Sequence, residues 1–238
     1  MCTASWLIRE DGFELFFNRD ESVRRGVARA PELVTLEGVP CLAPVDADAG
    51  GTWLGVNERG LALGLLNGWD ARSPSSAMHS RGLLVRDLLG LRGGAEVAER
   101  MERRPLDPYR GFMLLVLEPG RAPEVHTWDG FERRRGPADL PLCSSSFDGE
   151  RVREVRGRTF ERLRCAHGVL DAELLAEFQC SHAPERGPWS PCMHRAEAST
   201  VSASRIQVGE AEISFRYAAG PPCTTAFGPA LVLPRARA

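Results

Sequence analysis

Cys2 directly follows the initiator methionine, and no other residue of this 238-residue chain combines type and position in a way that points so clearly to chemistry. A small second residue such as cysteine permits removal of Met1, which would leave one residue with both a thiol and a free α-amine. The thiol is a nucleophile, and the amine, with a pKa of about 7.7 to 8.0, suits a general base near neutral pH. Cys2 therefore predicts attack on a carbonyl carbon that needs no histidine.

A short hairpin is expected to bring polar partners to Cys2. Residues 3–9 and 13–17 have the pattern of two strands, and Asp11-Gly12 supplies the turn between them. Antiparallel pairing returns the second strand to the end of the sheet where the first one starts. The segment 18–21, Asn-Arg-Asp-Glu, is therefore expected to lie beside Cys2.

The charged residues of this segment suit such a site. The Arg19 guanidinium would favour the thiolate of Cys2, because a nearby cation lowers the pKa of a thiol. Asp20 or Glu21 would accept a hydrogen bond from the α-ammonium group and orient it. A structural ion pair is the alternative role for Arg19.

A second hairpin ends at another polar residue, Asn67. Residues 50–57 and 60–67 are two apolar runs around a turn at residues 57–60. The Asn67 side-chain amide, at a strand end, is a candidate donor to the oxyanion of a tetrahedral intermediate. The alternative is an ordinary turn residue.

The rest of the chain alternates strands, helices and strands again, without a linker or an internal repeat. This order predicts one α+β layered domain over residues 1–238. The expected helices cover residues 81–91, 95–103, 150–166 and 171–178, and the further expected strands cover 112–117, 125–128, 199–208, 212–217 and 230–233.

Composition excludes several classes of function. The chain has no lysine, which removes Schiff-base chemistry and a phosphate-loop lysine. The net charge of −2 gives no electrostatic case for nucleic acid, and the arginine run 133–135 is expected to be a solvated turn. No apolar run reaches the roughly 18 residues of a membrane span. Seven scattered cysteines suit reduced thiols, so a cytoplasmic location is expected.

Two Cys-x-His pairs form a second group of candidate ligands. Cys180, His182, Cys192 and His194 are of the types that bind zinc, although their spacing is not that of a common zinc site. Residues two apart on a strand share a face, so each pair could converge on zinc or haem if the intervening loop closed back. The alternative is two unrelated loop cysteines beside polar histidines. No cofactor is expected for catalysis by Cys2.

The residues at both hairpins resemble a known family. Met1-Cys2-Thr3, the segment 17–21 and the Gly-Gly-Thr-Trp block at 50–53 are similar to the NRDE family (transport and Golgi organisation protein 2-like), and weaker similarity continues through residues 80–82, 143–148 and 200–202. Residues 57–67 are more distantly similar to the choloylglycine hydrolase and penicillin V acylase group of N-terminal nucleophile hydrolases.

This resemblance implies a four-layer αββα sandwich in which Cys2 cleaves a linear carbon–nitrogen amide bond through an acyl-enzyme. Arg19 matches the arginine beside the nucleophile of the acylases, and Asn67 matches their oxyanion-hole asparagine. The acylase carboxylate three positions after that arginine has no counterpart, because Ser22 stands there. The site residues implied by these motifs are, for catalysis, Cys2, Arg19, Asp20 and Asn67, and for substrate binding, Asn18, Glu21, Trp53 and Ser144.

Two functions are carried forward. The first is an amidohydrolase or acyltransferase with a small amide or acyl substrate. The second is a protein of the same fold that binds haem, a lipid or a metal without catalysis.

Overall fold

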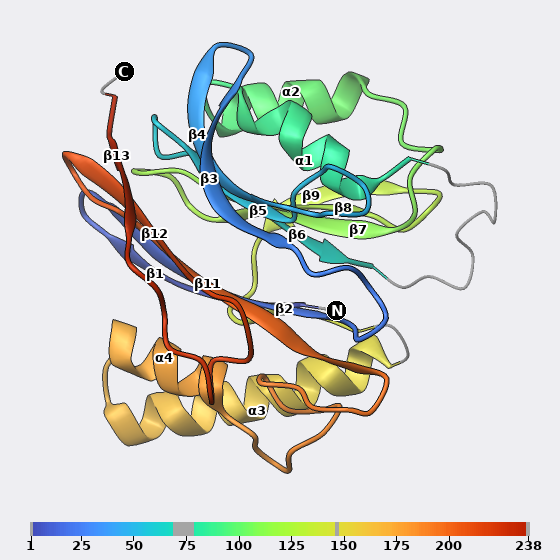
Figure 1. The fold of residues 1–238 in the computed structure, drawn as a ribbon, viewed down its shortest axis with the longest axis vertical. Coiled ribbons are helices and arrows are strands. Elements are labelled where there is room, and N and C mark those ends of the chain that lie inside the picture. The colour runs from blue at the N-terminus through green and yellow to red at the C-terminus, as the bar shows by residue number, and fades with distance from the viewer. Residues whose placement is uncertain (1, 69–78, 146–147, 237–238) are drawn as a thin grey trace.

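The computed structural model describes residues 2–68, 79–145 and 148–236. Two antiparallel β-sheets pack face to face, and a pair of helices covers the outer face of each sheet (Figure 1). The layers therefore follow the order helix, sheet, sheet, helix. This arrangement confirms the α+β four-layer sandwich predicted from the sequence.

Six strands form the sheet that carries the N-terminus, in the order β10-β1-β2-β11-β12-β13. Almost every residue of β2 is buried, because helices cover one face of this sheet and the second sheet covers the other. The strands are β1 (Cys2–Arg9), β2 (Gly12–Ser22), β10 (Leu142–Ser144), β11 (Ala198–Val208), β12 (Glu212–Ala218) and β13 (Leu231–Pro234).

Seven strands form the second sheet, and they follow one another in chain order from β3 to β9. Each strand pairs antiparallel with the next one, and the connection from β6 to β7 is the long one that contains α1 and α2. The strands are β3 (Arg29–Leu36), β4 (Val39–Val45), β5 (Leu54–Asn57), β6 (Ala62–Asn67), β7 (Phe112–Leu117), β8 (Glu124–Trp128) and β9 (Arg133–Pro137).

Four helices make the outer layers, and local signals set their ends. The Asp148 and Asp171 carboxylates accept hydrogen bonds from the first turns of α3 and α4, and Gly168 ends α3 in the left-handed conformation. Helices α1 (Arg81–Leu89) and α2 (Gly94–Arg103) cover the seven-stranded sheet, and α3 (Gly149–His167) and α4 (Ala172–Cys180) cover the six-stranded sheet.

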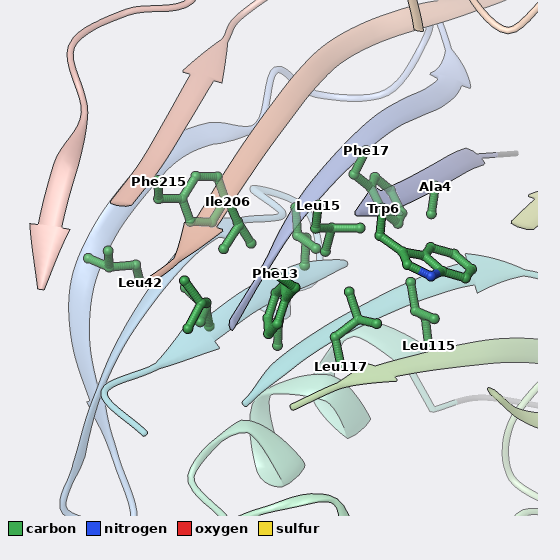
Figure 2. Packing of buried hydrophobic residues seen from close by; sticks show 14 of the residues in the cluster. Ala4, Trp6, Phe13, Leu15, Phe17, Leu42, Leu115, Leu117, Ile206 and Phe215 are labelled. Carbon is green, nitrogen blue, oxygen red and sulfur yellow. The ribbon is translucent and has the colours of Figure 1, made fainter. Parts of the chain in front are cut away.

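The main hydrophobic core lies between the two sheets (Figure 2). Trp6, Phe13 and Phe17 project from the β1–β2 hairpin toward Leu42 and Leu115 of the other sheet. Each fully buried aromatic side chain of this kind contributes about 1.5–3 kcal/mol to folding. The hairpin that begins with Cys2 is therefore held rigidly from within.

Smaller cores attach the helices to the sheets. Leu84 and Leu88 of α1 and Met101 of α2 pack on the seven-stranded sheet. Phe160 of α3 and Phe178 of α4 make an edge-to-face pair beneath β2. None of the helices in the described residues is both long and apolar enough to cross a membrane.

The structure confirms both predicted hairpins and all four predicted helices. The helix ends shift by at most two residues, whereas β2 continues to Ser22 and β5 begins only at Leu54. Sequence patterns did not predict β3, β4, β9 and β10. The prediction of a turn at Arg133–Arg135 is wrong, because these residues lie in the edge strand β9. Pairing with β8 makes this a strand, and its arginines stay at the surface, where Arg135 pairs with Glu124.

Candidate active site

Cys2 is the first residue of β1 and lies at the centre of three strands. It stands opposite Arg19 of β2 on one side and opposite Ser144 of β10 on the other. Its side chain is buried, and its backbone nitrogen donates a 3.0 Å hydrogen bond to the Ser144 hydroxyl. Neighbours on adjacent strands share a face, so the Cys2 and Arg19 side chains leave the sheet together.

A cavity of about 280 Å³ opens at this point, between the six-stranded sheet and the segments that lead into α1. Six of the residues predicted from the sequence line it: Cys2, Arg19, Asp20, Glu21, Trp53 and Asn67. The hairpin argument is therefore correct in bringing these residues to one place.

Arg19 is held firmly against one wall of the cavity. Its guanidinium carbon lies 4.2 Å from the centre of the Trp53 ring, and its Nη2 is 3.3 Å from a Glu21 oxygen and 3.5 Å from an Asp46 oxygen. A planar guanidinium can stack and pair with carboxylates at once, which an ammonium group cannot do. Arg19 is therefore both a structural ion-pair member and a fixed positive charge beside the thiol.

The environment of Cys2 has opposing effects on its thiol. Burial raises the thiol pKa to about 11, because desolvation disfavours the thiolate, and the Asp20 charge acts in the same direction. The Arg19 charge and a hydrogen bond from the Asp20 backbone favour the thiolate. The resting thiol is therefore neutral near physiological pH and needs a base beside it to react.

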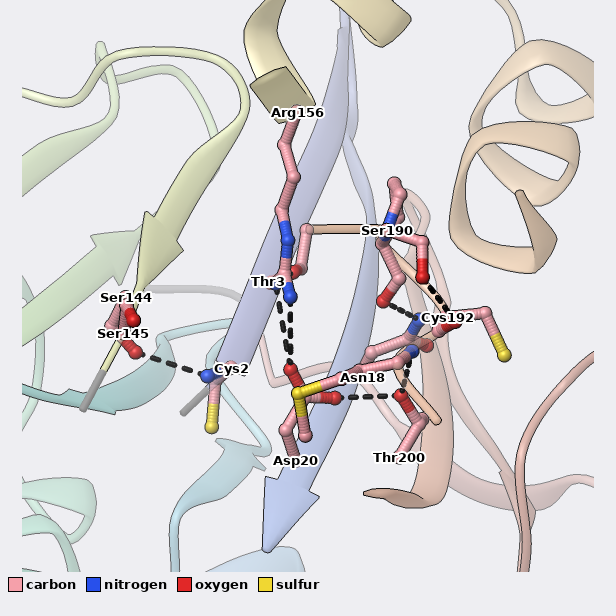
Figure 3. Close-up of polar contacts among 12 residues, drawn as sticks. Cys2, Thr3, Asn18, Asp20, Ser144, Ser145, Arg156, Ser190, Cys192 and Thr200 are labelled. Carbon is pink, nitrogen blue, oxygen red and sulfur yellow. Dashed lines mark hydrogen bonds and ion pairs between the residues drawn. The ribbon is translucent and has the colours of Figure 1, made fainter. Parts of the chain in front are cut away.

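Asp20 follows Arg19 in β2, so its side chain points to the opposite face of the strand. Figure 3 shows its carboxylate beside Arg156 and Thr200. Two guanidinium nitrogens of Arg156, from α3, lie 3.4 Å from its Oδ2, and the Thr200 hydroxyl donates a 2.6 Å hydrogen bond to its Oδ1. Arg156 also donates to the hydroxyl of Thr3, next to Cys2. This buried network ties β1, β2, β11 and α3 together behind the nucleophile.

Asn18 shares that face of β2 and points away from the cavity. Its Nδ2 donates to the carbonyl oxygens of Gln179 at 2.8 Å and Pro191 at 3.1 Å. Strand geometry thus divides the side chains of the Asn18–Glu21 motif. Those of Arg19 and Glu21 lie on the cavity side and those of Asn18 and Asp20 on the helix side, although Asp20 also borders the cavity.

Asn67 and Ser144 mark the boundary with an adjoining cavity of about 360 Å³. Asn67, at the end of β6, lines both cavities, and Ser144 lines the second one. The two residues therefore lie on the path between the thiol and the larger space.

Arg81 and Arg110 add positive charge to the cavity that contains Cys2. Nη1 of Arg81 donates a 2.7 Å hydrogen bond to the Gly111 carbonyl. Burial is the larger cause that lowers the pKa of Arg81 to about 10, and the charge of Arg110 is the smaller one. The Arg81 guanidinium therefore stays charged at neutral pH. In the described part of the chain, no carboxylate lies within ion-pair distance of either arginine.

A close approach of two loops places Arg81 there. A Cβ on Gly51 would come within 2.3 Å of the Gly82 carbonyl carbon, and the Thr52 amide donates to the Gly82 carbonyl oxygen at 3.0 Å. Only a glycine at position 51 lets the start of α1 lie against this loop.

The family model described as Transport and Golgi organisation 2 matches residues 1–136, more than half of the chain. The chain belongs to this family. The matched region contains both hairpins and the residues that line the cavity with Cys2, so the family resemblance expected from the Cys2, Asn18–Glu21 and Gly-Gly-Thr-Trp motifs is confirmed. No curated protein sequence matches significantly.

Several solved structures share the fold. The N-acylethanolamine-hydrolyzing acid amidase ortholog of Caenorhabditis elegans is 13% identical, with a TM-score of 0.59 over 85% of this chain and 92% of that one. The mutant C2A conjugated bile acid hydrolase of Clostridium perfringens is 13% identical, with a TM-score of 0.55 over 98% and 92%. The penicillin V acylase of Agrobacterium tumefaciens is 12% identical, with a TM-score of 0.53 over 92% and 84%.

At these identities the likeness shows the fold alone. This member of the Transport and Golgi organisation 2 family has the fold of the N-terminal nucleophile hydrolases, and it resembles amidases and acylases of that group.

Sequence reasoning missed Arg156 and did not assign a role to Arg81. Arg156 was detectable, because it follows Val152 by four residues and precedes Phe160 by four, on the face of α3 that is buried. Arg81 begins a predicted helix and lies in a segment of weak family resemblance, and neither observation assigned it to the site.

The structure regroups the predicted metal ligands. It brings His182, Cys192 and His194 together with Cys223, and it leaves Cys180 outside this cluster. None of the four clustered residues lines the cavity that contains Cys2.

Proposed function

We propose that this protein is an N-terminal nucleophile amidohydrolase in which Cys2, after removal of Met1, cleaves a linear amide bond through an acyl-enzyme. The observation that carries the proposal is the position of Cys2. It lines a cavity and stands opposite Arg19 on the adjacent strand, and its nitrogen lies 3.0 Å from the Ser144 hydroxyl. The shared fold with amidases and acylases supports it.

The first half of the reaction forms the acyl-enzyme. The α-amine of Cys2 takes the thiol proton, directly or through a water molecule, as the sulfur attacks the carbonyl carbon. Ser144 accepts a hydrogen bond from the amine and so directs its lone pair, and Arg19 stabilises the negative charge on sulfur. The Asn67 amide donates to the oxyanion. The carbon–nitrogen bond then breaks, and the α-ammonium group returns its proton to the leaving amine.

The second half releases the acyl group. Water attacks the thioester, and the α-amine again accepts a proton. The carbon–sulfur bond breaks, a carboxylic acid leaves, and the thiol is restored. An amine in place of water would make the same enzyme an acyltransferase.

The charges in the cavity favour an anionic substrate. Arg19 and Arg25 are matched by Glu21 and Asp46, whereas Arg81 and Arg110 have no such carboxylates among the described residues. A substrate carboxylate at Arg81 would complete a charge-assisted hydrogen bond. Haem, lipid or metal binding without catalysis stays a prediction from the sequence, and we do not extend the proposal to it.

Acylation with an activated ester tests the nucleophile. The Met1-processed protein, verified by intact mass, should form a thioester at Cys2 that hydroxylamine reverses. Cys2→Ala should abolish it, and Cys165→Ala, at an exposed site on α3, should not. Equal labelling of the Cys2→Ala protein, or no acylation of a processed chain, would refute the proposal.

The charge argument needs a separate test with substrates. Arg81→Gln should raise KM about tenfold for N-acyl amino acids, which corresponds to one lost charge-assisted hydrogen bond, and leave KM unchanged for neutral N-acyl amides. An equal effect on both substrates would contradict the assignment of Arg81.

A further inference from the structure

Four metal-binding side chains meet on the helix side of the six-stranded sheet. His182 follows α4, Cys192 and His194 precede β11, and Cys223 lies between β12 and β13. One ligand atom from each residue lies within 4.8 Å of the others. Two ends of the loop between α4 and β11 thus meet Cys223, which lies 29 residues beyond His194 in the sequence.

The distances suit a tetrahedral zinc ion. Nε2 of His194 lies 3.5 Å from Sγ of Cys192 and 3.4 Å from Sγ of Cys223. Zinc–sulfur bonds of about 2.3 Å and zinc–nitrogen bonds of about 2.0 Å at the tetrahedral angle separate sulfur from nitrogen by roughly 3.5 Å. Nε2 of His194 is therefore the nitrogen that faces both sulfurs, and Nδ1, on the other side of the ring, lies 3.5 Å from an Arg186 nitrogen.

His182 supplies an independent observation. Its Nε2 is buried and has no hydrogen-bond partner, and its ring lies edge to face against that of His194 at 5.1 Å. Buried polar atoms are normally paired, so this nitrogen calls for a ligand. A disulfide between Cys192 and Cys223 would use both sulfurs and still leave it unpaired, whereas a metal ion uses all four residues.

The surroundings explain why a metal would be useful here. Between α4 and β11, residues 181–197 form no helix or strand beyond one isolated bridge, and loops of this length are uncommon without an added constraint. The same loop positions the network behind Cys2, because the Met193 amide donates to the Thr200 hydroxyl at 2.8 Å, and that hydroxyl donates to Asp20. Figure 3 shows Asp20 and Thr200 between Cys2 and Cys192.

We propose that His182, Cys192, His194 and Cys223 bind one structural zinc ion that fixes residues 181–195 and the segment around Cys223 beneath β2 and β11. Four protein ligands fill the tetrahedral positions, so the ion has no open position for a substrate. The site is separate from the cavity of Cys2 and does not depend on its chemistry.

Metal analysis of the purified protein tests the proposal directly. The reduced protein should contain or take up about one zinc ion per chain, in competition with a colorimetric chelator. His194→Ala and Cys223→Ser should lose this ion. Cys180→Ser is the matched control, because Cys180 lies near the cluster in sequence but outside it, and this variant should keep the ion.

Cobalt substitution reports on the ligands without relying on variants that may lose their fold. Cobalt(II) in the wild-type chain should show the intense ligand-field bands of a tetrahedral site and a thiolate charge-transfer band, and zinc should abolish both. A reduced wild-type chain that binds neither zinc nor cobalt would overturn the proposal. A spectrum without thiolate charge transfer, or loss of zinc from Cys180→Ser alone, would also overturn it.

Discussion

The buried pair of Asp20 and Arg156 gives the sharpest test of how the site is held. Both side chains are fully buried, and Arg156 also donates to the Thr3 hydroxyl and to the Trp189 carbonyl. Arg156→Met would remove the Arg156 cation from the buried Asp20 carboxylate, and breaking a buried pair in this way costs about 3–5 kcal/mol. Asp20→Asn combined with Arg156→Met removes both charges and should recover at least about 2 kcal/mol of that loss.

Urea unfolding at neutral pH, under reducing conditions and followed by circular dichroism and tryptophan fluorescence, measures these free energies. The control is Arg158→Met on the same helix, whose exposed pair with Glu154 contributes at most about 0.5 kcal/mol. Loss of less than about 1 kcal/mol in Arg156→Met, or a double variant as unstable as the sum of the single ones, would refute the argument that the charge pair between Asp20 and Arg156 dominates.

Three further predictions concern the cavity. In a chain that keeps Met1, alkylation of Cys2 by iodoacetamide should rise about tenfold per pH unit up to pH 11, because its thiol pKa of about 11 leaves little thiolate at lower pH; a rate that levels off near pH 8 would contradict this. Gly51→Ala should destabilise the protein by about 1–3 kcal/mol in thermal or urea unfolding, since the new Cβ meets the backbone of Gly82. Arg19→Lys should slow acylation of Cys2 about tenfold in a stopped-flow assay, because lysine cannot stack on Trp53 while pairing with two carboxylates; an unchanged rate would show that the guanidinium shape is unimportant.

Short sequence patterns predicted the elements that depend on neighbouring residues, namely the hairpins and the helices. The β1–β2 hairpin was predictable because Asp11-Gly12 joins two apolar strands, and the helices because apolar residues repeat at helical spacing. By contrast, β3 and β9 are edge strands whose residues are mostly exposed or half-buried. They are strands because a neighbouring strand pairs with them, and no short-range pattern carries that information.

The same distinction applies to the side-chain clusters. Cys2 and Arg19 were predictable as neighbours because one hairpin carries both. Cys223 was not, because it reaches His194 only through the return of the chain along β11 and β12. Cys180 and His182 straddle the end of α4, so the strand-like alternation assumed for the pair does not apply there.

Side chains of the Asn18–Glu21 motif alternate between the two faces of β2, and the two faces have different roles. Arg19 and Glu21 face the space where a reaction would occur, whereas Asn18 and Asp20 hold α3, α4 and the loop before β11 in place. A related chain that kept Asn18 and Asp20 but had lost Cys2 and Arg19 would still assemble the same layers. Asn18 and Asp20 therefore indicate that a chain has this fold. Cys2, Arg19 and Glu21 indicate which family members should be assayed for enzymatic activity.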